Sequence, residues 1–132
     1  MEANELMVGD FLQRTYNHKI VRVHEIKQSC IYTEDNGYEY SEVESISLTP
    51  EILEKNGFKP QIPQNHIETV YACQDVSKAV AAELYALWSY RDGSFYLLLR
   101  VDGKDMVRMD VHYIHQLQHA LRLCGIKKEI IL

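Results

Sequence analysis

Three histidines near the C-terminus have the spacing at which side chains meet on one face of a helix. His112, His115 and His119 stand at positions i, i+3 and i+7, which puts them within about 60° of one another around a helix axis. Imidazoles on neighbouring turns lie about 5–6 Å apart and are able to chelate Zn²⁺, Ni²⁺ or Cu²⁺. These three residues, called the histidine stripe below, are the first candidate for chemistry.

The sequence around the stripe favours a polar surface over a dedicated metal site. A zinc site in a protein takes a third or fourth ligand from another element and has hydrogen-bond acceptors that orient its histidines. The chain has no H-E-x-x-H motif. The apolar face of the same helix, roughly opposite to the stripe, is formed by Tyr113, Ile114, Leu117, Ala120, Leu121 and Cys124. We therefore expect the stripe to face solvent or a partner, with metal binding as the alternative, and we predict no cofactor.

None of the sequence motifs that carry common catalytic chemistry is present. The chain has no G-x-S-x-G turn, no P-loop and no G-x-G-x-x-G fingerprint, and a predicted turn or helix end explains each of its six glycines. Three cysteines, Cys30, Cys73 and Cys124, are scattered without a C-x-x-C pair, which indicates buried free thiols. We predict that the protein is not an enzyme.

Charge is distributed unevenly along the chain, whose formal net charge is −5. Residues 28–54 include seven acidic side chains and no Lys or Arg, so this segment would repel a phosphate backbone. The preceding segment carries its basic residues at Arg14, Lys19, Arg22 and Lys27. A solvated sheet face is the favoured interpretation of these four, and a nucleic-acid-associated accessory factor that uses the strands from Arg14 to Lys27 is the alternative.

Aromatic side chains are a second candidate for a binding surface, because the chain has nine tyrosines and one tryptophan. Half-buried rings on strands are ordinary cross-strand packing, which we favour. The alternative is an aromatic surface for a protein partner, since Tyr and Trp are enriched at interfaces. The residues proposed for that surface are Tyr38, Tyr40, Trp88 and Tyr90.

The segment to residue 48 is predicted to be all β. Residues 20–26 are rich in β-branched side chains, and Asn36-Gly37 predicts a two-residue type I′ hairpin turn. The alternation of aromatic and acidic residues over 38–44 favours a strand with one wet face. Several short strands in so few residues suggest an SH3-like small barrel or a curled meander.

A short helix is predicted to follow. Thr49 is a suitable N-cap, Pro50 suits the first helical position, and Gly57 is able to adopt the left-handed conformation that ends a helix. We predict that this linking helix, with its capping residues, covers residues 49–58.

The C-terminal part, residues 66–132, is predicted to be an antiparallel meander with one amphipathic helix. Residues 77–84 fit a helical and a strand pattern alike, and we favour a strand from about Glu83 to Arg91. Asp92-Gly93 and Asp102-Gly103 predict hairpin turns. Asp110 is the expected cap of a helix over 111–124, and a short final strand is expected over 128–132.

These elements make an α+β fold of one domain, residues 1–132, with sub-units at 1–48, 49–58 and 66–132. Hydrophobic residues are 46 % of the chain and charged residues 25 %, which is typical of globular proteins. The N-terminus is unlike a signal peptide, and no apolar stretch approaches the roughly 18 residues of a membrane-spanning helix. We therefore expect a cytoplasmic protein without a membrane association.

Three segments together resemble a family of small proteins of unknown function from Bacteroides-type bacteria and their phages or prophages. They are 4–10, 46–58 and 111–117, the last continuing through His115-Gln116-Leu117-Gln118. The resemblance implies an accessory protein of a mobile element and supplies no reaction or ligand. We expect a non-enzymatic interaction module, with a protein partner or a second copy of the chain favoured over nucleic acid.

Overall fold

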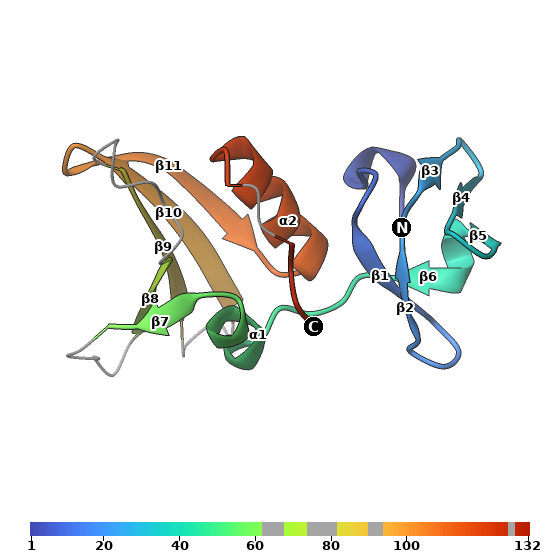
Figure 1. Ribbon diagram of the computed structural model, residues 1–132, viewed down its shortest axis with the longest axis horizontal. Helices are drawn as coiled ribbons and strands as arrows, with labels where there is room; N and C mark the ends of the chain where they lie inside the picture. The colour runs from blue at the N-terminus through green and yellow to red at the C-terminus, as the bar shows by residue number, and fades with distance from the viewer. Residues whose placement is uncertain (62–67, 74–81, 90–93, 127–128) are drawn as a thin grey trace. The chain divides into compact units, whose positions relative to one another are not determined.

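The chain has a mixed α+β fold, built mostly from antiparallel strands with few helices (Figure 1). The computed structural model describes residues 1–61, 68–73, 82–89, 94–126 and 129–132. The strands before the first α-helix are β1 (Phe11–Arg14), β2 (Ile20–Arg22), β3 (Glu25–Ile26), β4 (Cys30–Tyr32), β5 (Gly37–Glu39) and β6 (Val43–Glu44). The later elements are α1 (Pro50–Lys55), β7 (Phe58–Pro60), β8 (Glu68–Cys73), β9 (Ala82–Ser89), β10 (Ser94–Val101), β11 (Lys104–Val111) and α2 (Ile114–Leu123).

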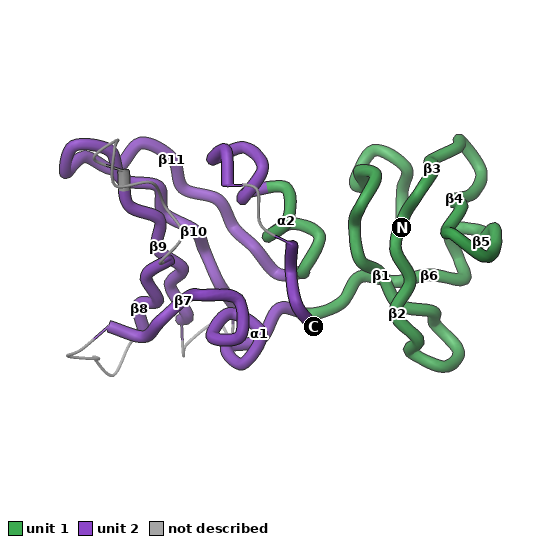
Figure 2. Tube along the Cα trace, in the orientation of Figure 1, with its two compact units in different colours: residues 1–47, 113–119 green, residues 48–112, 120–132 purple. Residues whose placement is uncertain are grey.

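The chain divides into two compact units, coloured separately in Figure 2. Unit 1 comprises residues 1–47 and 113–119, and unit 2 comprises residues 48–112 and 120–132. The end of the first stretch of unit 1 lies next to the predicted boundary at residue 48. The sequence did not suggest that residues 113–119 would join the N-terminal strands, because that association is not a local property of the chain.

Unit 1 contains two three-stranded antiparallel sheets that share one core. Their strand orders are β2-β1-β6 and β3-β4-β5. The buried residues of this core are Leu6, Leu12, Val21, Val23, Ile31, Tyr38 and Val43. Next to this core, the Val23 N–H donates to the carbonyl of Asp10 at 2.9 Å and its own carbonyl accepts from the Gly9 N–H at 2.7 Å, which extends the pairing of β1 with β2. The described residues form no closed barrel, so the SH3-like detail stays a prediction.

The hairpin predicted at Asn36-Gly37 forms with a different turn. β4 and β5 pair with Tyr32 opposite Gly37, so Gly37 is a strand residue and the loop covers Thr33 to Asn36. The Thr33 N–H donates to the Asn36 carbonyl at 2.8 Å, and the Asn36 N–H donates to the Thr33 hydroxyl at 3.3 Å. Gly37 is suited to its position because a Cβ there would lie 3.0 Å from the Tyr32 ring. The type I′ prediction is therefore wrong.

The predicted strand over residues 38–44 is interrupted. A 3₁₀ turn at Tyr40–Glu42 separates β5 from β6, and the Glu39 N–H donates to the Glu42 carboxylate at 2.9 Å. This local hydrogen bond competes with the sheet. As a result β5 pairs with β4 whereas β6 pairs with β1.

The linking helix is confirmed as α1. The Thr49 hydroxyl accepts from the Ile52 N–H at 3.3 Å, and Pro50 is the first helical residue. Gly57 has φ 84° and follows the helix end, as expected of a residue that stops a helix in the left-handed conformation.

Unit 2 is built on a five-stranded antiparallel sheet of order β11-β10-β9-β8-β7. The strand favoured over the ambiguous segment is confirmed as β9. The Asp102-Gly103 turn is also confirmed, with φ 52° and 77° as a type I′ turn requires. The predicted Asp92-Gly93 turn lies outside the described residues, as do residues 77–81 of the ambiguous segment.

The helix α2 begins three residues later than predicted. Val111 and Asp110 still belong to β11, where they pair with Phe95 and Tyr96 of β10, so Asp110 is not a helix cap. The pairing of β11 with β10 continues through Val111, which is the first residue of the amphipathic segment. The Tyr113 N–H donates to the Gln116 side chain at 3.2 Å, which satisfies an amide at the actual helix start.

Residues 129–132 do not form the predicted strand. The Asn56 side chain is wholly buried, and it binds the last residues in place of a neighbouring strand. Its amide donates to the carbonyls of Ile131 at 2.8 Å and Ile52 at 2.7 Å, and its oxygen accepts from the Ile131 N–H at 2.6 Å. One side chain therefore makes the pair of hydrogen bonds that a strand residue would make.

Replacing this amide tests its contribution to stability. We expect Asn56→Ala to lower the free energy of unfolding by about 2–4 kcal/mol, because two backbone groups of Ile131 lose their partner inside the protein. Gln61→Ala removes an exposed amide from the same unit and should change it by less than about 0.5 kcal/mol. Urea unfolding followed by circular dichroism measures both, and equal effects would contradict this role of Asn56.

Candidate functional site

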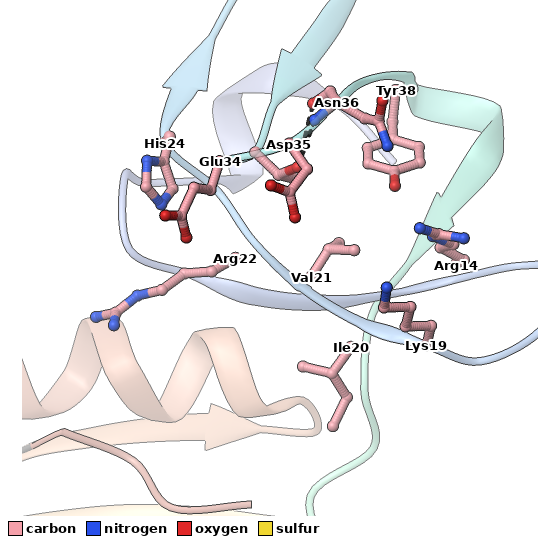
Figure 3. A pocket seen from close by; sticks show the side chains of 11 residues that line it. Arg14, Lys19, Ile20, Val21, Arg22, His24, Glu34, Asp35, Asn36 and Tyr38 are labelled. Atoms are coloured by element: carbon pink, nitrogen blue, oxygen red, sulfur yellow. Dashed lines mark hydrogen bonds between the residues drawn. The ribbon is translucent and has the colours of Figure 1, made fainter.

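A hollow of about 340 Å³ with charged walls lies in unit 1 (Figure 3). Its walls come from the β1–β2 hairpin and from the turn between β4 and β5. The residues that line it are Arg14, Lys19, Ile20, Val21, Arg22, His24, Thr33, Glu34, Asp35, Asn36 and Tyr38. We call this hollow the charged hollow.

Arg14 is fixed at the cationic side of the charged hollow by two tyrosines. Its guanidinium lies 5.4 Å from the ring centre of Tyr16 and 5.3 Å from that of Tyr38, and Nη1 donates to the Tyr16 hydroxyl at 2.5 Å. The Nε atom of Arg14 is buried and makes no hydrogen bond. The Arg14 guanidinium is thus held in place with part of its hydrogen-bonding capacity unused.

The acidic side of the charged hollow is formed by Glu34 and Asp35, both exposed. They stand on the turn that the Thr33–Asn36 hydrogen bonds close. Figure 3 shows them across the hollow from the ends of Arg14 and Lys19. The arrangement therefore has separate regions of positive and negative charge.

The predicted basic strands converge only in part. Arg14, Lys19 and Arg22 line the charged hollow. Lys27 does not line it, and its ammonium lies 3.9 Å from the Glu25 carboxylate and 5.1 Å from the ring centre of Tyr32. Lys127 and Lys128, which the same interpretation would add, lie outside the described residues.

The expectation that the histidine stripe faces solvent is wrong for one of its members. His115 is only 3 % exposed, whereas His119 has 23 % of its side chain exposed and His112 is exposed. The adjacent Gln118 is also buried. The reason is that α2 buries a polar side as well as an apolar one, and hydrophobic periodicity reports only the apolar side.

The polar side of α2 binds the backbone that leads into β1. The Gln118 oxygen accepts from the Phe11 N–H at 2.9 Å, and its amide donates to the Gly9 carbonyl at 3.0 Å. His119 Nε2 lies 2.7 Å from Oδ2 of Asp10, whose side chain is wholly buried. Since an ionised carboxylate only accepts hydrogen bonds, Nε2 carries the proton. Oδ2 also accepts from the Met7 N–H at 2.7 Å.

His115 is held between two rings. It stacks on Tyr113 with ring centres 5.8 Å apart, and it meets His119 edge-on at 5.7 Å. Its Nδ1 atom is buried and makes no hydrogen bond. Burial lowers the pKa of His115 and nearby His119 acts in the same direction, while Asp10 and Glu5 oppose them.

A second, polar hollow of about 270 Å³ adjoins these histidines within unit 1. Its lining residues are Asn4, Glu5, Ser45, Tyr113, His115, Gln116 and His119. Within the described part of the chain, no group of three or more His, Cys, Asp or Glu side chains is arranged to hold a metal ion. Within unit 1, His115 contributes ring packing and His119 contributes the hydrogen bond to Asp10.

The aromatic residues proposed for a surface lie in different environments. Tyr38 is a core residue, 7 % exposed, and Tyr40 is half-buried with its hydroxyl on the Lys27 carbonyl. Trp88 is half-buried in unit 2, with its ring centre 4.5 Å from that of Phe95. Tyr90 lies outside the described residues.

Sequence reasoning missed the groups that organise the site. The sequence explains Gly9 only by a turn or helix end, and it gives Asp10 and Gln118 no role. Phe11 and Gln118 are 107 positions apart, so no local pattern could pair them. The available signal was that residues 115–119 hold two histidines and two glutamines around Leu117, an unusual density of hydrogen-bonding groups for a helix.

Comparison with known proteins returns no match, since no family model, no curated protein and no solved structure is similar to the chain. Among the described residues, no helix has the length and apolar composition needed to cross a bilayer. Any functional inference therefore depends on the geometry of the chain itself.

The burial of His115 makes stability depend on pH. A histidine whose pKa is lowered in the folded state contributes full stability above its unfolded pKa of about 6.5 and loses it as pH falls towards the folded pKa. The free energy of unfolding should therefore fall between pH 7.5 and pH 5 more steeply in the wild type than in His115→Leu. Tyr113→Phe, which keeps the stacked ring, should retain the wild-type slope. Urea unfolding at several pH values measures this, and parallel curves for wild type and His115→Leu would contradict it.

Proposed function

We propose that the protein is a non-enzymatic interaction module that assembles with a second copy of itself through the outer edge of β11. The observation that carries this proposal is the exposure of that edge. β11 is the last strand of the five-stranded sheet and, in the described chain, pairs only with β10. Its residues 104–108 are all exposed.

The exposed part of β11 has an apolar centre. Met106 is 62 % exposed and Val107 is 43 % exposed. An edge strand offers unpaired N–H and C=O groups to another strand, and pairing two copies would complete those hydrogen bonds while covering both side chains. This is the edge-to-edge mode by which strands recognise each other.

The charges along β11 select a second copy in antiparallel orientation. Lys104, Asp105, Arg108 and Asp110 alternate in sign along the strand. Asp105 is bound to Arg100 of β10 at 2.9 Å, and Arg108 lies 4.1 Å from the ring centre of Tyr96. Arg108 and Asp110 lie on the same face of β11, because they pair in register with Leu98 and Tyr96 of β10. With Met109 on a two-fold axis, Arg108 of each copy faces Asp110 of the other, and among the described residues neither side chain has a hydrogen bond or an ion pair.

The same charges oppose less specific association. Proteins protect edge strands with charged residues and bulges, and β11 has both, since its register with β10 shifts between Leu99 and Arg100. Parallel in-register stacking would set Lys104 against Lys104 and Asp110 against Asp110. The edge therefore resists open-ended stacking while one closed, two-fold arrangement brings opposite charges together.

An accessory role in a mobile element, which the sequence resemblance implies, agrees with an interaction module and stays a prediction. The same holds for the absence of catalysis and for an SH3-like form of unit 1. The exposed β11 edge supports self-association without depending on any of these three.

Two single charge reversals test the proposed dimer. Arg108→Asp and Asp110→Arg each turn two attractive cross-strand pairs into repulsive ones, which should weaken the dimer about tenfold, since each pair contributes roughly 0.2–1 kcal/mol. An equimolar mixture of the two variants restores opposite charges and should recover the dimer. Sedimentation equilibrium over a concentration series measures the association constants.

The matched control is Lys59→Asp, which makes the same charge change on β7, the other edge strand of the same sheet, and should leave dimerisation unchanged. A wild-type protein that stays monomeric up to millimolar concentration would overturn the proposal. So would a dimer that neither β11 variant weakens.

The second candidate function is nucleic-acid association, which the convergence of Arg14, Lys19 and Arg22 in one hollow favours. Glu34 and Asp35 oppose it, because carboxylates in the hollow repel phosphate. If nucleic acid is the ligand, Glu34→Gln with Asp35→Asn should raise affinity for an oligonucleotide. We expect instead no salt-dependent binding by either protein, and fluorescence anisotropy across a salt series distinguishes the two outcomes.

A further inference from the structure

We propose that the charged hollow of unit 1 is a binding site for a zwitterionic small ligand of the amino-acid or dipeptide class. Such a ligand carries a carboxylate and an ammonium group a short distance apart. The hollow presents Arg14 and Lys19 on one side and Glu34 and Asp35 on the other (Figure 3). One ligand would meet both sides, whereas a simple anion or cation would meet one favourable and one unfavourable side.

The charged side chains on both sides of the hollow are available to bind a ligand. Among the described residues, the side chains of Lys19, Glu34 and Asp35 make no hydrogen bond and no ion pair. Opposite charges this close would be expected to pair if their backbones allowed it. Here the charges stand apart because each side belongs to a hairpin with its own internal hydrogen bonds.

The β1–β2 hairpin fixes the cationic side. The Arg14 N–H donates to the Lys19 carbonyl at 2.9 Å, and the Lys19 N–H donates to the Asn17 side chain at 3.0 Å. Stacking between Tyr16 and Tyr38 restricts the Arg14 guanidinium, so less conformational entropy is lost when an anion binds it. A ligand carboxylate fits this side.

The acidic side suits an ammonium group. Glu34 and Asp35 stand on a turn whose backbone is closed by the Thr33 N–H to Asn36 carbonyl bond at 2.8 Å and by the Thr33 hydroxyl. Two carboxylates on one short turn provide several acceptor oxygens for the three donors of an ammonium. Figure 3 shows His24 beside Glu34 at this end of the hollow.

The size and lining of the hollow restrict the ligand further. Its volume of about 340 Å³ is at the small end of the range of about 300–1,000 Å³ for small-molecule sites, which suits one or two amino-acid residues. Ile20 and Val21 supply apolar surface between the charged sides. A polyanion is disfavoured because its repeated phosphates would also meet the carboxylates.

The test begins with the full-length protein and a defined panel of probes. The twenty amino acids and a series of Gly-Xaa dipeptides are screened by thermal shift, and the strongest probe is titrated by ¹H–¹⁵N NMR. We expect saturable binding with a Kd below about 1 mM, with shifts at the amides of Lys19 and Asp35. The N-acetyl and the C-amide derivatives of that probe, each lacking one charge, should bind at least about fivefold more weakly.

Protein variants test the two sides separately. Lys19→Gln and Glu34→Gln should each weaken the same probe at least about fivefold. Both positions are exposed, so the fold should be retained, and the NMR spectrum verifies this. The matched controls Lys59→Gln and Glu54→Gln make the same chemical changes at exposed positions of unit 2 and should leave the affinity unchanged.

Three results would overturn the proposal. The first is the absence of saturable binding by any probe in the panel. The second is equal affinity for the free probe and both of its singly charged derivatives, since binding would then not depend on a zwitterion. The third is stronger binding after Glu34→Gln, which would identify the hollow as an anion site.

Discussion

The carboxylate of Asp10 has no exposed surface, so protein groups have to compensate its charge, and this requirement organises unit 1. The Met7 N–H and His119 bind one of its oxygens, while its backbone carbonyl accepts from Val23 at the end of the β1–β2 pairing. Removing a partner from a buried charge is far more costly than removing a surface ion pair. The N-terminal segment, the start of β1 and residues 113–119 are thereby held together at one point.

Local rules were sufficient wherever a structure depends on adjacent residues. Thr49, Pro50 and Gly57 determine α1, and Asp102-Gly103 determines the β10–β11 turn, because capping and positive φ are properties of a few neighbouring residues. Asn36-Gly37 has the same signal as Asp102-Gly103 and a different outcome. There, the Thr33–Asn36 hydrogen bonds and the Tyr32 ring over Gly37 favour a longer loop, so contacts within the hairpin decided between two acceptable turns.

The candidate site was less predictable because it consists of polar contacts between distant segments. Periodicity identified the apolar side of α2 correctly at Ile114 and Leu117, which are wholly buried. It assigned His115 to solvent, since a pattern of hydrophobicity cannot distinguish an exposed polar residue from a buried polar residue whose neighbours accept it. Gln118 illustrates the second case, because it binds the backbone of Gly9 and Phe11 as a neighbouring strand would.

Charged residues have three different roles in this chain, and their surroundings, rather than their type, separate the roles. Asp10 is buried and paired, so its charge stabilises a particular arrangement of segments. Asp105 lies on β11 against Arg100, so its charge is largely used within the sheet. Lys19 and Asp35 face a hollow from two hairpins, and Arg108 and Asp110 lie on one face of an open edge strand. These last two groups combine exposure with fixed backbones and opposite sign, which is what recognition of another molecule requires.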